Sequence, residues 1–215
     1  MNINKKIYKN ILSKYPDLIL GKHLSEAWMN DPKHLLFSLS RYKFVSKLLE
    51  GYKKVLEVGA GDGFLSRIID QNVNRLDLCD IEIANIEYFK KIKFNKNKYF
   101  IHDFSKKISY EKYDAIYSID VIEHISPKKV NKFMKNQVKS LSNNGTLIIG
   151  TPSRESQRYS SKYSKMGHVN VYTKSELKKF CYKYFNNVFV FSMNDEIIHT
   201  GYDKMSHYLF ALCIK

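Results

Sequence analysis

Five short runs of apolar and β-branched residues recur along the middle of the chain, and each ends at or beside a glycine or an aspartate. The segments between them have the length and spacing of helices or short loops. Strands buried on both faces are apolar throughout, so this alternation is typical of an α/β fold with a parallel sheet. The predicted strands cover residues 55–58, 75–80, 99–104, 113–120 and 145–150.

The N-terminal residues are patterned differently. Apolar positions recur at helical spacing over residues 4–15 and again in a longer run that begins at the Asp31-Pro32 pair and stops at Gly51. Trp28 lies in a polar stretch between these runs and is predicted to be a packing anchor. We expect one domain over 1–215, with a helical cap over 1–50 that packs against an α/β core over 51–215.

The C-terminal third predicts further elements. Ser126 and Pro127 are expected to open a helix before the fifth strand, since proline is favoured at a first helical position. Residues 151–172 have no regular period. Thr173 and Glu176 then form a capping box for another helix. Two final strands are predicted over 188–193 and 207–214, and the connection between them is too long for a tight hairpin.

Composition narrows the class of protein. With 215 residues and 44% hydrophobic content, the chain is large enough for one domain with a sizeable core. Its start is polar, and no run approaches the roughly 18 apolar residues of a membrane span, so we expect neither a signal peptide nor a membrane segment. The three cysteines show no C-x-x-C pair. This spacing favours reduced thiols and a cytoplasmic location.

The net charge of +15 raises the question of nucleic-acid binding. Thirty-one of the 36 basic residues are lysines, and they are scattered along every segment. A dedicated RNA binder more often concentrates arginine, which forks onto phosphate and stacks on bases. A solvated lysine surface is therefore the favoured interpretation, and a nucleic-acid partner is not expected. The pattern leaves the oligomeric state open.

The sequence KKVLEVGAGDGF, residues 53–64, carries the strongest chemical signal. A strand runs directly into a turn with Gly59 and Gly61, where the backbone can approach a ligand that a Cβ would block. The next strand ends on Asp80, at about the distance where a second strand of a doubly wound sheet delivers a carboxylate to a ribose diol. Together these features predict an adenosine-containing cofactor.

The details of the turn distinguish between adenosine cofactors. A nicotinamide fingerprint has its third glycine five residues after the first, whereas here Gly63 comes at four and Glu57 precedes the turn. This E-x-G-x-G-x-G form resembles the first motif of class I S-adenosylmethionine-dependent methyltransferases, over roughly residues 50–215. The resemblance implies a Rossmann-like, seven-stranded mixed sheet with helices on both faces. Its last strand enters antiparallel between the fifth and sixth.

The resemblance also implies a cofactor site for S-adenosylmethionine, whose product is S-adenosylhomocysteine. Asp103 is expected to bond the adenine amino group, Phe104 to pack on the ring, and the end of the fourth strand to face the methionine portion. Arg41 is either a partner of the methionine carboxylate or part of a surface ion pair. The expected cofactor-binding residues are Arg41, Glu57, Gly59, Ala60, Gly61, Phe64, Asp80, Ile81, Asp103, Phe104, Ile119 and Asp120.

Methyl transfer to a hydroxyl needs a positioned acceptor and often a base. The ends of the fourth and fifth strands are neighbours in this topology, so His124 and His168 are expected to face one pocket. We predict His168 as the general base, with His124 and Glu123 as further catalytic candidates. His124 has the alternative role of pinning its loop. Residues 119–122 lack the N-P-P-Y-like motif of base methylases and look like small-molecule enzymes of the ubiquinone-biosynthesis type.

A metal site is the alternative use of the same residues. Two carboxylates and two imidazoles suit a divalent ion, and the set is Asp120, Glu123, His124 and His168. Small-RNA 2′-O-methyltransferases use a similar segment, but with glutamate in the first position. Because many relatives with this segment need no metal, we expect none to be required.

Basic and aromatic residues are interleaved just before His168. They indicate either a solvated basic loop or a site for an anionic acceptor, since arginine matches phosphate geometry. The expected acceptor contacts are Arg154, Arg158, Tyr159, Tyr163 and Tyr202. The favoured function is methylation of a small polar metabolite or sugar, on oxygen rather than nitrogen. The layout is similar to bacterial enzymes of surface-polysaccharide clusters. The alternatives are an RNA methyltransferase acting on 2′-hydroxyls and a binding protein without turnover.

Overall fold

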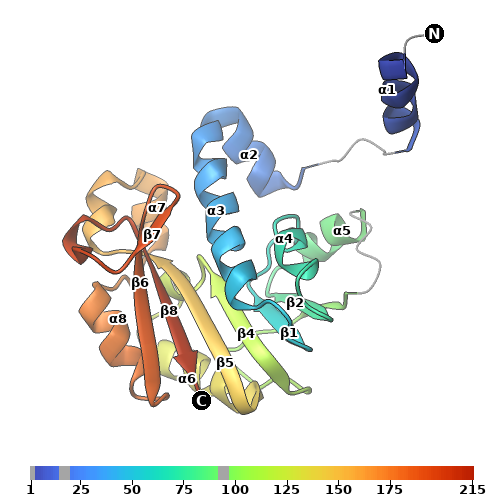
Figure 1. The fold of residues 1–215 in the computed structure, drawn as a ribbon. Helices are drawn as coiled ribbons and strands as arrows, with labels where there is room; N and C mark the ends of the chain where they lie inside the picture. Colours follow the sequence, from blue (N-terminus) through green and yellow to red (C-terminus); the bar gives the residue numbers. More distant parts are fainter. Residues whose placement is uncertain (1–2, 15–19, 92–96) are drawn as a thin grey trace.

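The computed structural model describes residues 3–14, 20–91 and 97–215. Its centre is one mixed sheet of eight strands in the order β3-β2-β1-β4-β5-β8-β6-β7 (Figure 1). The strands are β1 Val55–Val58, β2 Leu76–Asp80, β3 Tyr99–Ile101, β4 Tyr113–Ile119, β5 Leu141–Pro152, β6 Asn187–Asn194, β7 Ile197–His199 and β8 Tyr208–Ile214.

Strand directions divide the sheet into two parts. β1 pairs in parallel with β2 and β4, and the parallel pairing continues to β3 on one side and β5 on the other. β8 enters antiparallel between β5 and β6, as the family resemblance implied. The predicted count of seven strands is low by one, because three residues of the long connection after β6 pair antiparallel with that strand as β7. The Rossmann-like fold itself is confirmed.

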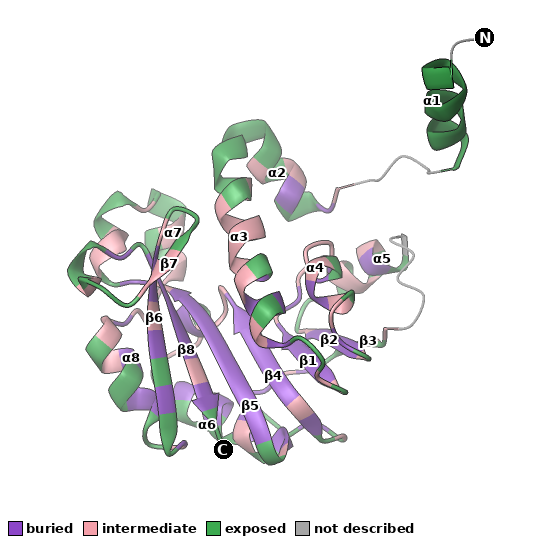
Figure 2. Cartoon of the chain, in the orientation of Figure 1, coloured by how far each residue is buried: buried purple, intermediate pink, exposed green. Residues whose placement is uncertain are grey.

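Helices cover both faces of the sheet. On one face, α3 (Pro32–Leu48) and α4 (Arg67–Asp70) share a hydrophobic cluster with β4 and β8, with Val45 and Ile69 fully buried. On the other face, α6 (Val130–Ser140) and α8 (Lys174–Cys181) pack through Met134 and Leu177. α5 (Ile83–Lys91) packs against β2 through Phe89. The central strands β1, β2, β4 and β8 are almost continuously buried (Figure 2), which explains their apolar sequences.

The N-terminal region forms three helices, α1 (Ile3–Lys14), α2 (Lys22–Asn30) and α3. α3 begins as the sequence predicts: the Asp31 side chain accepts a hydrogen bond from the His34 N–H, and Pro32 occupies the first turn. The expectation for Trp28 is wrong. This side chain lies on α2 and is 57% exposed, so it anchors no packing.

Two other boundaries differ from the pattern. α6 begins at Val130, because residues 126–129 form a turn in which the Ser126 carbonyl accepts from the N–H groups of Lys129 and Val130. The stretch after β5, which has no regular period in sequence, contains two short helical pieces, η2 Glu155–Tyr159 and α7 Lys162–Gly167. A third, η3 Asp203–Met205, lies in the connection between β7 and β8. The Thr173–Glu176 capping box is present and opens α8.

Candidate active site

The glycine turn after β1 has the tight geometry that its sequence predicts. Gly59 has φ +77, and a Cβ there would lie 2.3 Å from Cγ2 of Val121, which follows β4. Its N–H donates to the Cys79 carbonyl at 2.9 Å, which ties the turn to β2. Only glycine combines this left-handed backbone with so close an approach of another strand end.

Asp80 lies at the end of β2 and fixes the second half of the turn. One carboxylate oxygen accepts from the Gly61 N–H at 2.9 Å, and the other accepts from the Glu82 N–H at 2.9 Å. A carboxylate oxygen has a second lone pair. Asp80 therefore shapes the turn while retaining capacity to accept hydrogen bonds from a ligand in the adjoining pocket.

Glu57 lies beneath the turn rather than in the pocket. Its buried carboxylate accepts from the hydroxyls of Tyr42 at 2.7 Å, Tyr117 at 2.6 Å and Ser66. Burial raises the pKa of Glu57 to about 7, and the three hydroxyl donors only partly oppose that shift. Glu57 therefore joins α3 and β4 to the turn that it supports, and its contact with the cofactor stays a prediction.

The end of β3 supplies a second acid. The Asp103 carboxylate accepts from the Ser105 N–H at 2.8 Å and pairs with Lys106 at 3.3 Å. Partial burial alone would raise the Asp103 pKa, but these donors outweigh it, and the pKa is lowered. Phe104 is buried, with its ring 4.5 Å from the ring of His102. An acid and an aromatic side chain therefore stand together where the sequence placed them.

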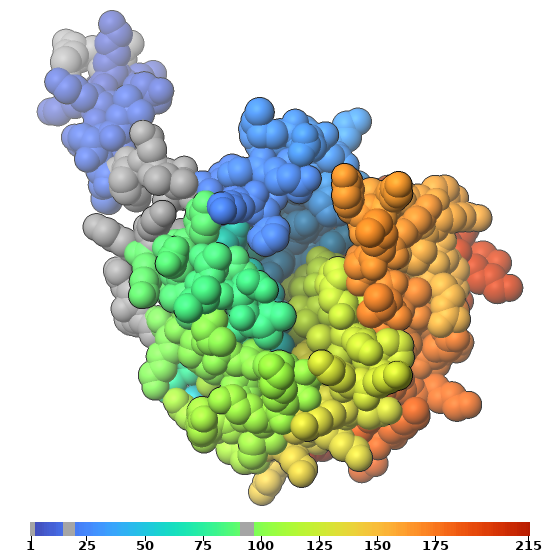
Figure 3. Space-filling model, turned by 180° about the vertical axis from the view of Figure 1, so that it is seen from behind, coloured from blue at the N-terminus to red at the C-terminus, as the bar shows by residue number. Residues whose placement is uncertain are grey.

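These strand ends surround a cavity of about 730 Å³, and the space-filling view in Figure 3 shows a hollow between the N-terminal helices and the segments after the strands. Most of the predicted cofactor residues line it: Gly59, Ala60, Gly61, Asp80, Ile81, Asp103, Phe104, Ile119 and Asp120. Sequence reasoning missed several lining residues, namely His23, Asp62, His102 and Lys129. Asp62 and His102 adjoin predicted positions, so proximity in the motif was a usable signal. Nothing in the pattern pointed to His23.

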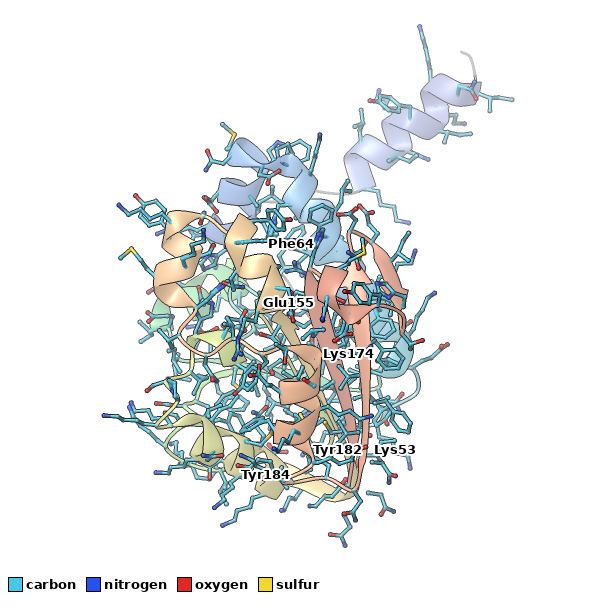
Figure 4. The ribbon with its side chains drawn as sticks, turned by 90° about the vertical axis from the view of Figure 1, so that its left-hand side faces the viewer. Lys53, Phe64, Glu155, Lys174, Tyr182 and Tyr184 are labelled. Carbon is cyan, nitrogen blue, oxygen red and sulfur yellow. The ribbon has the colours of Figure 1, made fainter. Side chains whose placement is uncertain are left out.

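Besides Glu57, two predicted cofactor residues do not line this cavity. Phe64, labelled in Figure 4, donates its backbone N–H to the Asp62 carboxylate at 3.1 Å. Arg41 is nearly buried and donates to the Asp120 carboxylate at 2.9 Å, with its guanidinium 4.0 Å from the centre of the Tyr208 ring. The ion-pair alternative is therefore present, as an internal pair that holds the end of β4, and a contact of Arg41 with the methionine carboxylate stays a prediction.

A second cluster stands beside the cavity, after β4. Glu123, His124 and His168 each offer a ligating atom, and these atoms lie within 4.8 Å of one another. The two imidazole rings are 5.1 Å apart between centroids. Of the three, His124 lines the cavity. The predicted convergence of the two histidines is present.

Backbone hydrogen bonds bring the two parts of this cluster together. The Glu123 carbonyl in η1 (Ile122–His124) accepts from the N–H groups of Val169 at 2.8 Å and Asn170 at 3.0 Å. The Asn170 side chain also donates to the Ile122 carbonyl at 3.2 Å. The segment that follows α7 is thus attached to the end of β4, and His168 is held against His124.

The hydrogen bonds of the two histidines define their free nitrogens. His124 Nδ1 lies 3.0 Å from the Gly167 carbonyl, and His168 Nδ1 lies 2.9 Å from the Gln157 amide oxygen. Both oxygens only accept, so each Nδ1 carries hydrogen and each Nε2 is left to accept a proton. Burial, followed by the nearby His124, lowers the pKa of His168, so its imidazole is neutral at pH 7.

Glu123 is buried and stays protonated near neutral pH. Burial, followed by the charge of Asp120, raises its pKa to about 8. One carboxyl oxygen accepts from the Thr151 hydroxyl at 3.1 Å, whereas Oε1 has no hydrogen-bond partner among the described residues. A proton or a cation on this oxygen would satisfy it.

Three of the four residues of the predicted metal set, Glu123, His124 and His168, are placed so that they could hold a divalent ion. A carboxylate and two imidazole nitrogens with fixed Nδ1–H partners match the ligands and supporting bonds of such sites. Asp120, the fourth residue of the predicted metal set, is outside this cluster and is paired with Arg41. A bound ion would act there as a Lewis acid that lowers the pKa of an acceptor hydroxyl.

The residues predicted to contact the acceptor are spread over a wider area. Arg154 does not face the main cavity. It pairs with Glu176 at 2.6 Å and donates to the Val171 carbonyl at 2.9 Å. These residues line a separate cavity of about 280 Å³ beside α8. Tyr202 is exposed next to η3 and does not line the main cavity. The other three predicted contacts are exposed: Arg158 and Tyr159 on η2 and Tyr163 on α7. Glu155, the first residue of η2, is labelled in Figure 4.

Comparison with known proteins agrees with this geometry. A family model described as a methyltransferase domain matches residues 25–184, so the chain belongs to the methyltransferase-domain family. Family and fold together define the class: an S-adenosylmethionine-dependent methyltransferase of class I.

More specific relatives are distant. The ubiquinone biosynthesis O-methyltransferase of Rickettsia canadensis (strain McKiel) is 28% identical over 123 residues, which are 56% of this chain and 49% of that protein. The chain thus spans about half the length of the curated relatives it matches.

Solved structures share the fold at low identity. The methyltransferase domain of bacterial CtHen1-C has a TM-score of 0.68 at 19% identity, covering 83% of this chain and 98% of that one. The N-methyltransferase NodS from Bradyrhizobium japonicum WM9 has a TM-score of 0.64 at 16% identity, covering 87% and 90%.

Proposed function

We propose that this protein transfers the methyl group of S-adenosylmethionine to an oxygen of a small, polar and anionic acceptor. The observation that carries the choice of oxygen is the group formed by Glu123, His124 and His168 beside the cofactor cavity. A hydroxyl is a weak nucleophile until it loses its proton, so a base beside the transferred methyl favours O-methylation.

The cofactor half of the reaction uses the strand ends. Asp80 accepts hydrogen bonds from the ribose hydroxyls, and the glycine turn lets the cofactor lie against the backbone. Asp103 and Phe104 hold the adenine, and the end of β4 at Ile119 and Asp120 faces the methionine portion. Arg41 keeps Asp120 in place, which makes it a positioning residue.

The acceptor half uses the cluster after β4. Nε2 of His168 takes the hydroxyl proton as the acceptor oxygen bonds to the methyl carbon and the carbon–sulfur bond breaks, which leaves S-adenosylhomocysteine. His124 lines the cavity and orients the hydroxyl. Glu123 keeps its proton through the transfer, because its raised pKa leaves it neutral near pH 7, and it adds no charge of its own to the cluster.

The anionic character of the acceptor follows from exposed cations near this cluster. Lys129 lines the cavity, and Arg158 lies on η2 and makes no ion pair with another described residue. A phosphorylated or nucleotide-linked sugar would satisfy both, and such acceptors suit a role in surface polysaccharide biosynthesis. Three free, buried thiols agree with a cytoplasmic reaction.

The test is a turnover assay with isotopically labelled S-adenosylmethionine and a panel of hydroxyl and amine acceptors, with and without phosphate groups. We expect labelled methyl ethers from phosphorylated hydroxyl acceptors. Methylamine products, or equal rates with uncharged sugars, would contradict the choice of oxygen or of anion. Binding and methylation of bulk RNA that persist at high salt would instead favour the RNA methyltransferase alternative, which the lysine-rich charge allows.

A further inference from the structure

The N-terminal helix α1 is unlike the other long helices of the molecule, because none of its residues is buried. Figure 1 draws it apart from the sheet and its covering helices, and Figure 2 colours it exposed along its whole length. Its apolar side chains are each at least half exposed: Ile3 74%, Ile7 53%, Tyr8 65%, Ile11 50% and Leu12 63%. None of them belongs to the hydrophobic clusters of the core.

These side chains share one side of the helix. Ile3, Ile7 and Ile11 are each four positions apart, so they lie in one row, and Tyr8 and Leu12 form the adjacent row. Lys5, Lys6 and Lys9 lie on the other side, Lys14 ends the isoleucine row at the C-terminal turn, and α1 contains no acidic residue. α1 is therefore a basic amphipathic helix with an unpartnered apolar face.

A helix of this length is marginal in water without tertiary packing. Its apolar side needs a surface to cover it, and its lysines select a negative one. RNA would satisfy the charge but not bury aliphatic side chains, and a second copy of α1 would bring like charges together. A membrane surface with anionic lipids satisfies both faces, since the apolar side enters the acyl boundary and the lysines meet the headgroups.

We infer that α1 attaches this protein to anionic lipid bilayers by lying in the plane of the membrane surface. Twelve helical residues are too few to cross a bilayer, and no helix among the described residues is long and apolar enough to do so. The attachment is independent of the methyl-transfer chemistry, because no residue of α1 lines the cavity.

The experiment is flotation of the purified full chain with vesicles of phosphatidylcholine alone or mixed with phosphatidylglycerol. We expect binding only to the mixed vesicles, weakening as salt is added. The variant Ile7→Gln/Ile11→Gln, which keeps helix propensity, should reduce partitioning at least about tenfold. The variant Lys5→Gln/Lys6→Gln/Lys9→Gln should reduce it about fivefold for each lysine replaced.

A matched control separates α1 from the overall charge of the chain. The variant Lys178→Gln/Lys179→Gln/Lys183→Gln removes the same charge at α8, which Figures 1 and 4 both place away from α1. We expect this control to bind nearly as wild type, and all variants to keep the wild-type melting temperature and affinity for S-adenosylmethionine.

Three results would overturn the inference. They are absence of vesicle binding by the wild type, an equal loss in the α8 control, and a dimer that dissociates when the α1 isoleucines are replaced. The last result would assign the apolar face to a second copy of the chain.

Discussion

The two halves of the site are built in different ways. The cofactor half consists of residues at the ends of four consecutive strands, β1 to β4, and its key contacts join neighbours in the sheet, such as the Gly61 N–H and the Asp80 carboxylate. The acceptor half joins residues far apart in the chain, because backbone and side-chain hydrogen bonds between the segment around His168 and η1 hold His168 beside His124.

This difference has a chemical consequence. Backbone groups and one acid fix the cofactor half, so its geometry is rigid and tolerates little change. The acceptor half rests on side chains whose protonation is set by burial, with the pKa of Glu123 raised to about 8 and that of His168 lowered. Substitutions in the first half should therefore change binding, and substitutions in the second should change turnover.

The largest expected effect is on turnover. His168→Ala should lower kcat by about 10²–10⁴-fold, because the acceptor hydroxyl loses its base. The affinity for S-adenosylmethionine should stay at the wild-type value, since His168 does not line the cavity. Steady-state kinetics and calorimetry on the same preparation measure the two quantities.

His124→Ala is the control for that prediction. It should cost less than the His168 variant if His124 chiefly orients the acceptor and braces the Gly167 carbonyl. A His168 variant with near wild-type kcat and unchanged acceptor KM would remove His168 from the mechanism and leave Glu123 or His124 as the base.

The next effect concerns the cofactor half. Asp80→Ala should weaken S-adenosylmethionine binding by about ten- to a hundredfold, because a buried hydrogen bond to a charged group contributes roughly 1.5–3 kcal/mol. The affinity of the Asp80→Asn variant for S-adenosylmethionine should lie between those of the wild type and Asp80→Ala, since an amide oxygen can still accept from the Gly61 N–H. Calorimetry that shows NADH bound and S-adenosylmethionine ignored would refute the cofactor assignment.

The pH profile should sharpen the comparison. A base acts in its deprotonated form, so kcat/KM should fall about tenfold per pH unit below the pKa of His168. Because burial and His124 lower that pKa, the fall should begin below the ordinary histidine value of 6.5. His124→Gln removes one of the two causes and should move the fall to higher pH. A fall that begins near pH 8 would instead point to Glu123.

The smallest expected effect is that of metal removal. Dialysis against EDTA should change kcat by less than about twofold, since a neutral Glu123 and a base at His168 need no ion. Titration with Mn²⁺ checks directly whether the three donors bind one. Loss of turnover that Mg²⁺ or Mn²⁺ restores would make Glu123, His124 and His168 a metal centre and refute the metal-free mechanism.

The cofactor half was largely predictable because its signals are local. A strand, a glycine turn and an acid at the next strand end lie close together in the chain, and the α/β pattern fixes that parallel strands end at one edge of the sheet. Gly59, Asp80 and Asp103 therefore line the cavity as expected. The caps at Asp31 and Thr173 were predictable for the same reason.

Other features depended on contacts that no local pattern encodes. Nothing in the sequence around Arg41 indicates which residue it pairs with. The pair with Asp120 forms because α3 packs beside β4. Arg154 is drawn to Glu176 at the start of α8, and Glu57 is withdrawn beneath the turn by three hydroxyls from separate elements. β7 exists because an edge of β6 was available to pair with it.

The sequence by itself therefore determined the class of fold, the adenosine-type turn and the residue types of the acceptor cluster. The topology also brought His124 and His168 to neighbouring strand ends, but only the tertiary structure decided that Glu123 joins them while Asp120 pairs with Arg41. Secondary structure and turns follow from neighbouring residues, whereas the distance between His124 and His168 depends on how a segment after β5 is hydrogen-bonded to the end of β4. Burial, which sets the pKa of Glu123, likewise exists only once the layers of the fold have closed around it.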